Sequence, residues 1–197
     1  MGTHVAPAPA RTHVQARRRE RIVRTAAALA SRGGIDAMQM RAVAERAGVA
    51  LGTLYRYFPS KMDLLVAIIS EELNLLEASI EHRPPTASAP SARAVDVLMR
   101  ATRSLMRDPE FAEGVLRAMV FTEGEVGMEF GDRIGRLLLR VAFGVGGDTE
   151  LDATRLVVCR LLQGVWLSEL LGLLRGRRTM AEAESHLRLG AERLLAP

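Results

Sequence analysis

Residues 51–61 read LGTLYRYFPSK and hold the side chains best suited to bind a nucleic acid. Arginine can bond the O6 and N7 atoms of guanine, so Arg56 and the upstream Arg41 are candidate base readers. Leu51 can contact a thymine methyl group, and Gly52 lets a base pair approach the backbone closely. Hydroxyl and ammonium groups suit phosphate oxygens, and here they belong to Thr53, Tyr55, Tyr57 and Lys61. The alternative is that the two tyrosines are ordinary core aromatics.

Two short helices should position these side chains. The apolar spacing predicts helices over 39–47 and 50–58, joined by a turn at Gly48, where a positive φ costs glycine little. Pro59 should end the second helix, and Ser60 is a suitable cap for the next. Four residues are spaced to pack the unit: Ala44, Val49, Leu54 and Phe58. The pattern predicts a helix-turn-helix whose second helix reads DNA.

The charge distribution supports a polyanionic partner. Residues 11–61 contain eleven basic and three acidic residues, a net charge of +8. The remaining residues carry 16 basic and 20 acidic side chains, a net charge of −4. Neutralising phosphates releases counterions, so a basic N-terminal part on an acidic body fits DNA binding. The alternative is a well-solvated helix.

The fold class is predicted to be all-α. Aromatic residues make up 4% of the chain, so the core must be aliphatic, which favours helices. No alternating strand pattern or internal repeat occurs, and about nine helices are expected. Beyond the pair above, they cover 15–32, 61–80, 92–107, 109–120, 125–145, 149–174 and 179–195.

Several classes of protein are disfavoured by residue type. The chain has one cysteine, Cys159, which excludes an internal disulfide and disfavours a zinc cluster. Its four histidines are scattered, and no Ser/His/Asp set or paired metal ligands occur, so no enzyme is expected. The chain has no signal peptide pattern and no uncharged apolar run of 18 residues, which indicates a cytoplasmic protein.

The C-terminal half should hold a dimer interface and an apolar pocket. The helix over 149–174 is apolar nearly all round, and a homodimer through it and through Leu187, Leu194 and Leu195 would cover its second face. The alternative is a fully internal helix. Methionines fill adaptable cavities, and the pocket candidates are Met99, Met106, Phe111, Met119, Phe121, Met128, Phe130, Leu138, Phe143 and Trp166. Each of them can instead be ordinary core.

GVALGTLYRYFPSK, followed by LL, closely resembles the signature of the TetR family of bacterial repressors. The resemblance implies three DNA-binding helices, a connecting fourth helix and a variable body that binds ligand and dimerises. Residues 1–14 lack helical periodicity and are expected to form a disordered tail. The resemblance then places a helix-turn-helix domain at 15–60 and a ligand-binding and dimerisation domain at 61–197. The family usually opens the second helix with Ser or Thr, whereas Met38 and Gln39 stand here, so Gln39 is the candidate replacement for that phosphate contact. Ala50 likewise lacks the usual capping hydroxyl.

QMRAVAERAGVALGTLYRYFPSK with LLV, and VWLSELLGLL further on, resemble the KstR-type TetR repressors of sterol catabolism in actinobacteria. That resemblance implies induction by a steroid acyl-CoA and control of sterol degradation genes. The two-fold dimer expected above predicts a palindromic operator. Alternatives within the class are a fatty acyl-CoA or a drug as effector, with control of fatty-acid metabolism or efflux. Alternatives outside it are an all-α enzyme and a non-specific DNA-packaging protein, against which the acidic body argues.

Overall fold

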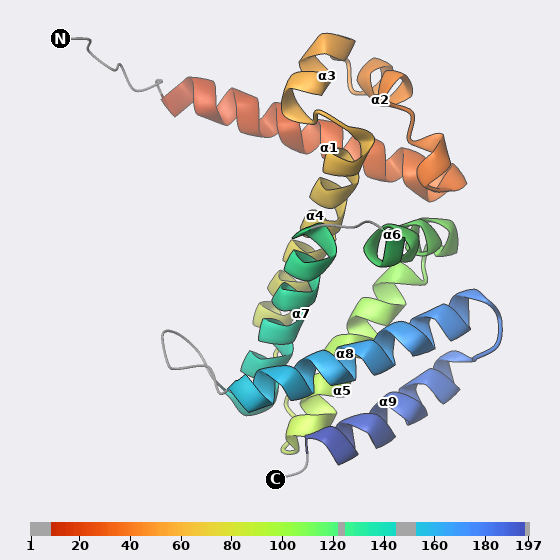
Figure 1. Cartoon of the computed structure of the whole chain (residues 1–197). Helices are drawn as coiled ribbons and strands as arrows, with labels where there is room; N and C mark the ends of the chain where they lie inside the picture. The colour runs from red at the N-terminus through yellow and green to blue at the C-terminus, as the bar shows by residue number, and fades with distance from the viewer. Residues whose placement is uncertain (1–8, 122–124, 145–152, 196–197) are drawn as a thin grey trace. The chain divides into compact units, whose positions relative to one another are not determined.

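The computed structural model describes residues 9–121, 125–144 and 153–195, and this part of the chain forms nine α-helices without a strand (Figure 1). Side chains are described for 13–116, 130–144 and 153–195. The all-α prediction is confirmed. The helices are α1 (Pro9–Ala37), α2 (Met40–Arg46), α3 (Leu51–Tyr57), α4 (Lys61–His82), α5 (Pro90–Leu105), α6 (Pro109–Phe121), α7 (Glu125–Phe143), α8 (Ala153–Leu174) and α9 (Met180–Leu194).

Both ends of the first helix differ from the sequence-based prediction. The first helix begins at Pro9, so residues 9–14 are helical where a tail was expected. Gly33 and Gly34 do interrupt α1, since Gly34 has a φ of 66°, but helical turns resume and continue to Ala37. The break predicted at Gly146–Gly147 and the cap predicted at 148–149 lie outside the described residues.

The chain divides into two compact units, Met1–Ile69 and Ser70–Pro197, and the division falls within α4. The prediction had placed the division at residue 60. In the first unit, α2 packs against both α1 and α3. The buried side chains of this unit come from all four of its helices, for example Ile22, Val43, Leu54 and Leu64.

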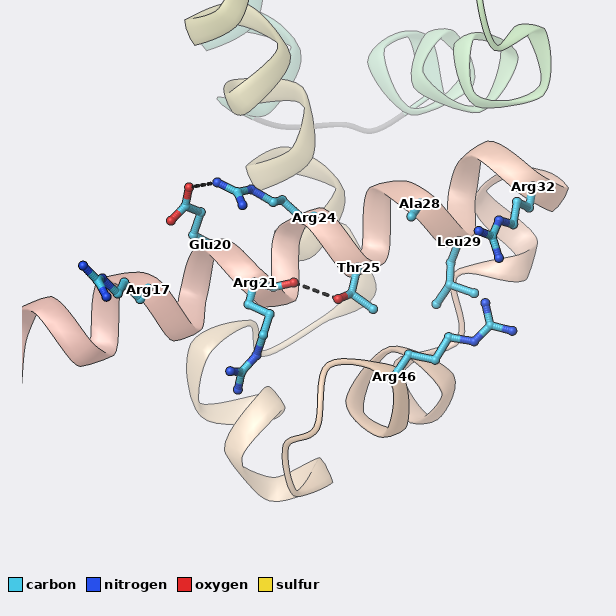
Figure 2. A pocket seen from close by; sticks show the side chains of 9 residues that line it. All are labelled: Arg17, Glu20, Arg21, Arg24, Thr25, Ala28, Leu29, Arg32 and Arg46. Carbon is cyan, nitrogen blue, oxygen red and sulfur yellow. Dashed lines mark hydrogen bonds and ion pairs between the residues drawn. The ribbon is translucent and has the colours of Figure 1, made fainter.

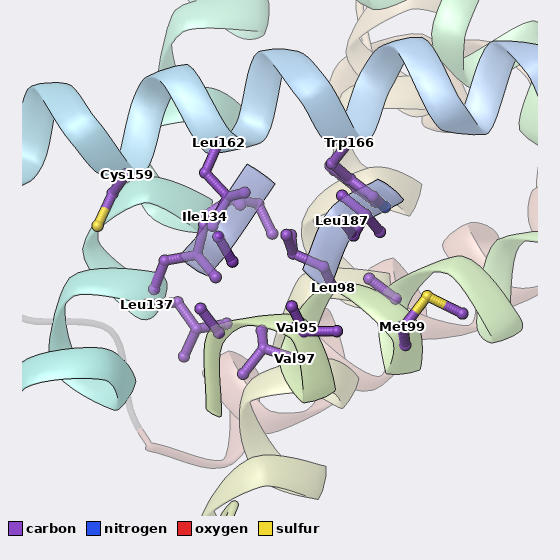
Figure 3. Close-up of a cluster of buried hydrophobic side chains, with 14 of the residues drawn as sticks. Val95, Val97, Leu98, Met99, Ile134, Leu137, Cys159, Leu162, Trp166 and Leu187 are labelled. Atoms are coloured by element: carbon purple, nitrogen blue, oxygen red, sulfur yellow. The ribbon is translucent and has the colours of Figure 1, made fainter. Parts of the chain in front are cut away.

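The second unit is built around one aliphatic cluster. Helix α8 packs against α7 and α9, and α5 also packs against α7 and α9. Figure 3 shows Leu162 and Trp166 pointing from α8 into a cluster that includes Leu98 of α5 and Leu187 of α9. The segment between α4 and α5 is an ordered loop, because Arg93 donates to the carbonyl oxygens of Ala87 and Ser88 and to those of Val141 and Ala142 on α7.

Among the described side chains of this apolar unit, two polar ones are buried, Thr102 and Gln163. Trp166 donates from Nε1 to the Thr102 hydroxyl over 2.8 Å, and that hydroxyl donates to the Leu98 carbonyl oxygen over 2.7 Å. Thr102 is therefore satisfied within the core, as buried polar groups generally must be. No hydrogen bond to the Gln163 amide is found among the described residues.

Helix α8 has a buried face and an exposed apolar face. Leu162, Trp166 and Leu170 are buried, whereas Val157 and Leu161 are more than half exposed. By length and composition α8 is also the one described helix apolar enough to cross a membrane, a property shared by core helices of other folds. Its packing against α7 and α9 accounts for the buried part of that apolar surface.

The expected dimer face needs a correction at its C-terminal end. Leu187 is fully buried and Leu195 is 6% exposed, because both belong to the internal cluster of the second unit. Leu194 packs against the same cluster and is half-buried. The exposed leucine of α9 is instead Leu189.

Candidate nucleic-acid interface

A tight turn joins α2 to α3. Gly48 has a φ of 64°, in the left-handed region that glycine tolerates, as predicted. Its N–H donates to the Glu45 carbonyl oxygen over 3.2 Å, and the Val49 N–H donates to the Ala44 carbonyl oxygen over 3.0 Å. These bonds reverse the chain within four residues and fix α3 against α2.

Helix α3 turns one face inward and presents the others to solvent. Leu54 and Phe58, four residues apart, are buried, and they anchor the helix to the unit. Tyr55 is 46% exposed, so it is no ordinary core aromatic. Arg56 is exposed and its guanidinium lies 6.0 Å from the ring centroid of Tyr57, which is half-buried.

The N-terminal turn of α3 is open to an external partner. Leu51 is 40% exposed, and Thr53 is half-buried. A Cβ atom added at Gly52 would meet nothing within 4 Å, so no contact within the chain explains a glycine there. Glycine costs about 1 kcal/mol relative to alanine in a helix, and no neighbour within the chain accounts for that cost at this position.

The start of α2 lacks the usual side-chain cap, as its sequence indicated. Gln39 occupies the N-cap position with extended backbone, but its Nε2 donates backwards to the Asp36 carbonyl oxygen over 3.1 Å. Arg41 is exposed, and its Nε lies 3.5 Å from Oε1 of Glu45 in an ion pair that solvent screens. Ala50 likewise provides no side-chain cap for α3.

Helix α4 begins with a reciprocal cap. The Asp63 N–H donates to the Ser60 hydroxyl over 3.1 Å, and the Ser60 N–H donates to the Asp63 carboxylate over 2.8 Å. This arrangement satisfies backbone donors at the helix start and explains why a new helix follows Pro59 at once. Lys61 therefore lies in the first turn of a capped helix. Its Nζ is 3.9 Å from Oδ1 of Asp36.

Two structural roles in this unit were missed at the level of sequence. Met38 was treated as a departure from a capping position, yet it is fully buried and belongs to the core. Arg19 was counted only as a positive charge, but its guanidinium lies 5.3 Å from the centre of the Phe58 ring and joins α1 to the end of α3. The spacing of apolar residues in α1 could not predict this stacking, because it joins two residues that are far apart in the sequence.

The pocket candidates of the second unit are distributed over the core. Met99, Phe111, Leu138 and Trp166 are buried, and Met106, Phe130 and Phe143 are half-buried. The side chains of Met119, Phe121 and Met128 lie outside the described ones. The sequence did not single out Gln163, the buried amide beside these residues on α8, because nothing in its neighbours distinguishes it from a surface glutamine.

Comparison with protein families matches both units. Residues 22–68 match the family of bacterial regulatory proteins described as the tetR family. Residues 88–194 match the family described as the tetracyclin repressor-like C-terminal domain. The two matches include α2 and α3 completely and all helices from α5 to α9 in whole or nearly so.

Individual relatives share most of the chain. It is 40% identical over 184 residues to the HTH-type transcriptional repressor KstR of Rhodococcus jostii (strain RHA1), covering 93% of this chain and 85% of that protein. It is 35% identical to KstR of Mycolicibacterium smegmatis, covering 93% and 90%. A crystal structure of a TetR transcriptional regulator from Rhodococcus sp. RHA1 is 31% identical and superposes with a TM-score of 0.73 over 92% of this chain and 97% of that one.

Proposed function

Because the chain belongs to the TetR family of bacterial regulatory proteins, which are DNA-binding regulators and not enzymes, we propose that it represses genes of sterol catabolism from an operator that it binds as a dimer. The observation that carries this proposal is its identity to KstR repressors along 93% of its length. A regulator that acts on chromosomal DNA works in the cytoplasm.

The DNA contacts proposed for this function lie on α3 and beside it. The exposed guanidinium of Arg56 and that of Arg41 read bases, Leu51 contacts a thymine methyl group, and Gly52 admits the DNA edge. The remaining contacts are to phosphates, through Gln39, Thr53, Tyr55, Tyr57 and Lys61. Gln39 must release its bond to the Asp36 carbonyl oxygen to take part.

The test of this function is a binding titration with the promoter of the chain's own gene. Discrimination of at least about 1,000-fold over scrambled DNA at the same salt concentration is expected of a specific regulator. Transcription from that promoter should fall when the protein is added. Equal affinity for promoter and scrambled DNA would instead favour a non-specific packaging protein.

Dimerisation is proposed through an exposed stripe on α8. Val157, Leu161, Gly164, Ser168 and Leu171 alternate at spacings of four and three residues, which is the repeat of paired helices. We call these five residues the α8 stripe. All five are exposed, and a Cβ at Gly164 would meet nothing within 4 Å, so a partner helix can approach closely there. A two-fold dimer predicts a palindromic operator.

The proposed effector is a large hydrophobic molecule, a steroid acyl-CoA. The buried surroundings of α5, α7 and α8 are apolar, which suits a steroid body better than a sugar or nucleotide. We assign the polar contact to Gln163, which is 7% exposed. Its Nε2 would lie 3.4 Å from a Cβ at Gly131, so the amide faces α7.

No hydrogen bond to the Gln163 amide is found among the described residues, and a hydrogen bond to a bound carbonyl or hydroxyl group would contribute about 0.5–1.5 kcal/mol. Gln163 therefore favours an effector that carries an oxygen within its apolar body. The alternatives that remain are a fatty acyl-CoA or a drug.

The effector is tested by titrating a fluorescent operator complex with cholanoyl-CoA, palmitoyl-CoA and free CoA. Release by cholanoyl-CoA alone supports the proposal, and release by palmitoyl-CoA alone would favour the fatty-acid alternative. Gln163→Met keeps the volume but removes the amide, so about tenfold more effector should be needed while operator affinity is unchanged. Equal release by free CoA would rule out recognition of the steroid.

A further inference from the structure

The DNA-binding unit has a second basic surface apart from the exposed face of α3. An open groove of about 600 Å³ runs along α1 and reaches the last turn of α2 (Figure 2). Five arginines line it, four from α1 (Arg17, Arg21, Arg24 and Arg32) and one from α2 (Arg46). We call this surface the arginine groove. Neither the helix-turn-helix nor the effector proposal uses it.

The positive charges of the arginine groove are largely unopposed. Its single acidic residue, Glu20, forms an ion pair with Arg24 one turn away. Among the described residues, no ion pair is found for the other four arginines: Arg17, Arg21, Arg32 and Arg46. Figure 2 shows Arg32 and Arg46 reaching toward one another from α1 and α2. These like charges repel one another in the free protein, and a bound polyanion would relieve that repulsion.

The shape of the groove suits an extended anion better than a compact one. Arg32 lies fifteen positions after Arg17, and at a rise of 1.5 Å per residue this stretch of α1 is about 22 Å long. One DNA strand advances about 3.4 Å per phosphate along the helix axis, so several phosphates can lie along it. The apolar floor, at Ala28 and Leu29, provides no groups that read bases.

We propose that the arginine groove binds the DNA backbone beside the bases read by α3 and so extends the footprint without adding sequence specificity. In helix-turn-helix proteins the helix before the recognition helix crosses the backbone. Arg46 stands in the last turn of that helix, α2, and so connects the groove to the helix that precedes the recognition helix. The inference rests on the proposed DNA-binding function and adds a phosphate-binding surface to it.

The decisive experiment compares the salt dependence of operator binding for the full chain and for the variant Arg17→Gln/Arg21→Gln/Arg32→Gln/Arg46→Gln. The slope of log K against log salt is negative, and each lost phosphate contact makes it shallower by about 0.9, so a reduction in steepness of about 3–4 is expected for each protomer of the bound dimer. The ratio of operator to scrambled affinity should stay the same. A preserved slope overturns the proposal, and so does a collapse of the ratio, because the groove would then read bases.

Two matched controls sharpen the comparison. Arg24→Gln lies in the same groove but removes a charge already neutralised by Glu20, so its effect on the slope should be smaller than that of Arg21→Gln. Arg140→Gln removes an exposed arginine from α7 and should leave the slope unchanged. Equal effects of all three substitutions would mean that net charge alone acts, which contradicts a localised site.

Thermal unfolding of the free protein gives a second readout. Removing mutual repulsion should keep or raise the melting temperature of the four-residue variant, whereas a structural role of the arginines would lower it. If that variant fails to fold, the pairs Arg17→Gln/Arg21→Gln and Arg32→Gln/Arg46→Gln are measured, each with an expected reduction in the steepness of the slope of about 2 for each protomer. If the wild type does not prefer its operator, the proposed function is refuted. If the wild type does prefer it and the four-residue variant has the same slope, only the proposed role of the arginine groove is refuted.

Discussion

At the scale of single residues, α3 carries buried packing residues on one face and, on its exposed faces, the residues proposed to contact DNA. Leu54 and Phe58 are buried and hold the helix, and Arg19 stacks on the Phe58 ring from α1. Tyr55 and Arg56 are exposed and take no part in that core. Substitutions on the exposed face should therefore change DNA binding without changing the fold.

We expect Arg56→Ala to lower operator affinity by about 10–100-fold, since one good bidentate contact to a base contributes about 1–3 kcal/mol of discrimination. Circular dichroism and the melting temperature should be unchanged. Arg56→Lys is the matched control, because it keeps the charge but loses the fork of donors. It should keep affinity for scrambled DNA and lose preference for the operator. Full retention of specific binding by Arg56→Ala would remove this residue from the interface.

Cys159 illustrates a residue whose chemistry is set by burial. It lies in the core cluster, and burial raises the pKa of its thiol to about 11. Folding therefore favours the neutral thiol, a contribution that is complete below the pKa of an exposed thiol, about 8.5, and is lost as the pH rises through about 11.

At pH 8 the native protein should react with Ellman's reagent at least about 100-fold more slowly than the protein unfolded in guanidinium, because the reactive thiolate is both scarce and inaccessible. The rate is followed by absorbance. Rapid reaction of the native protein, with its melting curve intact, would show that Cys159 is accessible.

At the scale of secondary structure elements, α8 has one apolar face that is buried in the core and another that is exposed. Leu162, Trp166 and Leu170 face α5, α7 and α9 in the core, and the Thr102 hydroxyl accepts the Trp166 N–H. The α8 stripe, defined above, remains exposed on the other side. The proposed two-fold dimer would cover this stripe with a second copy of the helix.

Leu161→Glu should convert the dimer to a monomer, because it places a charge in the middle of the α8 stripe, at a position that is 55% exposed in the single chain. Losing the second half-site should lower operator affinity by about 100-fold or more. Analytical ultracentrifugation gives the mass, and a gel shift gives the affinity. Leu75→Glu, at an exposed leucine of α4, is the control and should leave both unchanged. A Leu161→Glu variant that stays dimeric would place the interface elsewhere.

At the scale of the whole molecule, the geometry of the proposed dimer predicts the spacing of the two operator half-sites. Two recognition helices related by a two-fold axis read half-sites separated by about one DNA turn, or 10–10.5 base pairs. The contacts of each half-site come from its own protomer, so the relative rotation of the half-sites controls simultaneous binding.

Inserting five base pairs at the operator centre should turn one half-site by about half a turn and reduce affinity to that of a single half-site. Footprinting and competition titration measure the change. An operator with the same number of substituted central base pairs but unchanged length is the control and should bind normally. Insensitivity to the insertion would contradict a rigid two-fold dimer.

The helix-turn-helix could be predicted from sequence because its determinants are local. Gly48 makes its turn through its own backbone freedom, Pro59 ends α3 by lacking an N–H, and Leu54 and Phe58 are buried at helical spacing within one element. The +8 charge of residues 11–61 is likewise a property of the sequence alone. These features indicate the family and a DNA partner without reference to any tertiary contact.

Tertiary structure decided which residues share a surface across different elements. Sequence spacing could not assign Leu187 and Leu195 to the core instead of a dimer face, because burial depends on which helices pack against α9. It could not show Gln163 facing Gly131, or Arg46 completing a groove with α1, since each pair lies on separate helices. Local conformation is set by neighbours in the chain, whereas a binding surface depends on how distant segments pack.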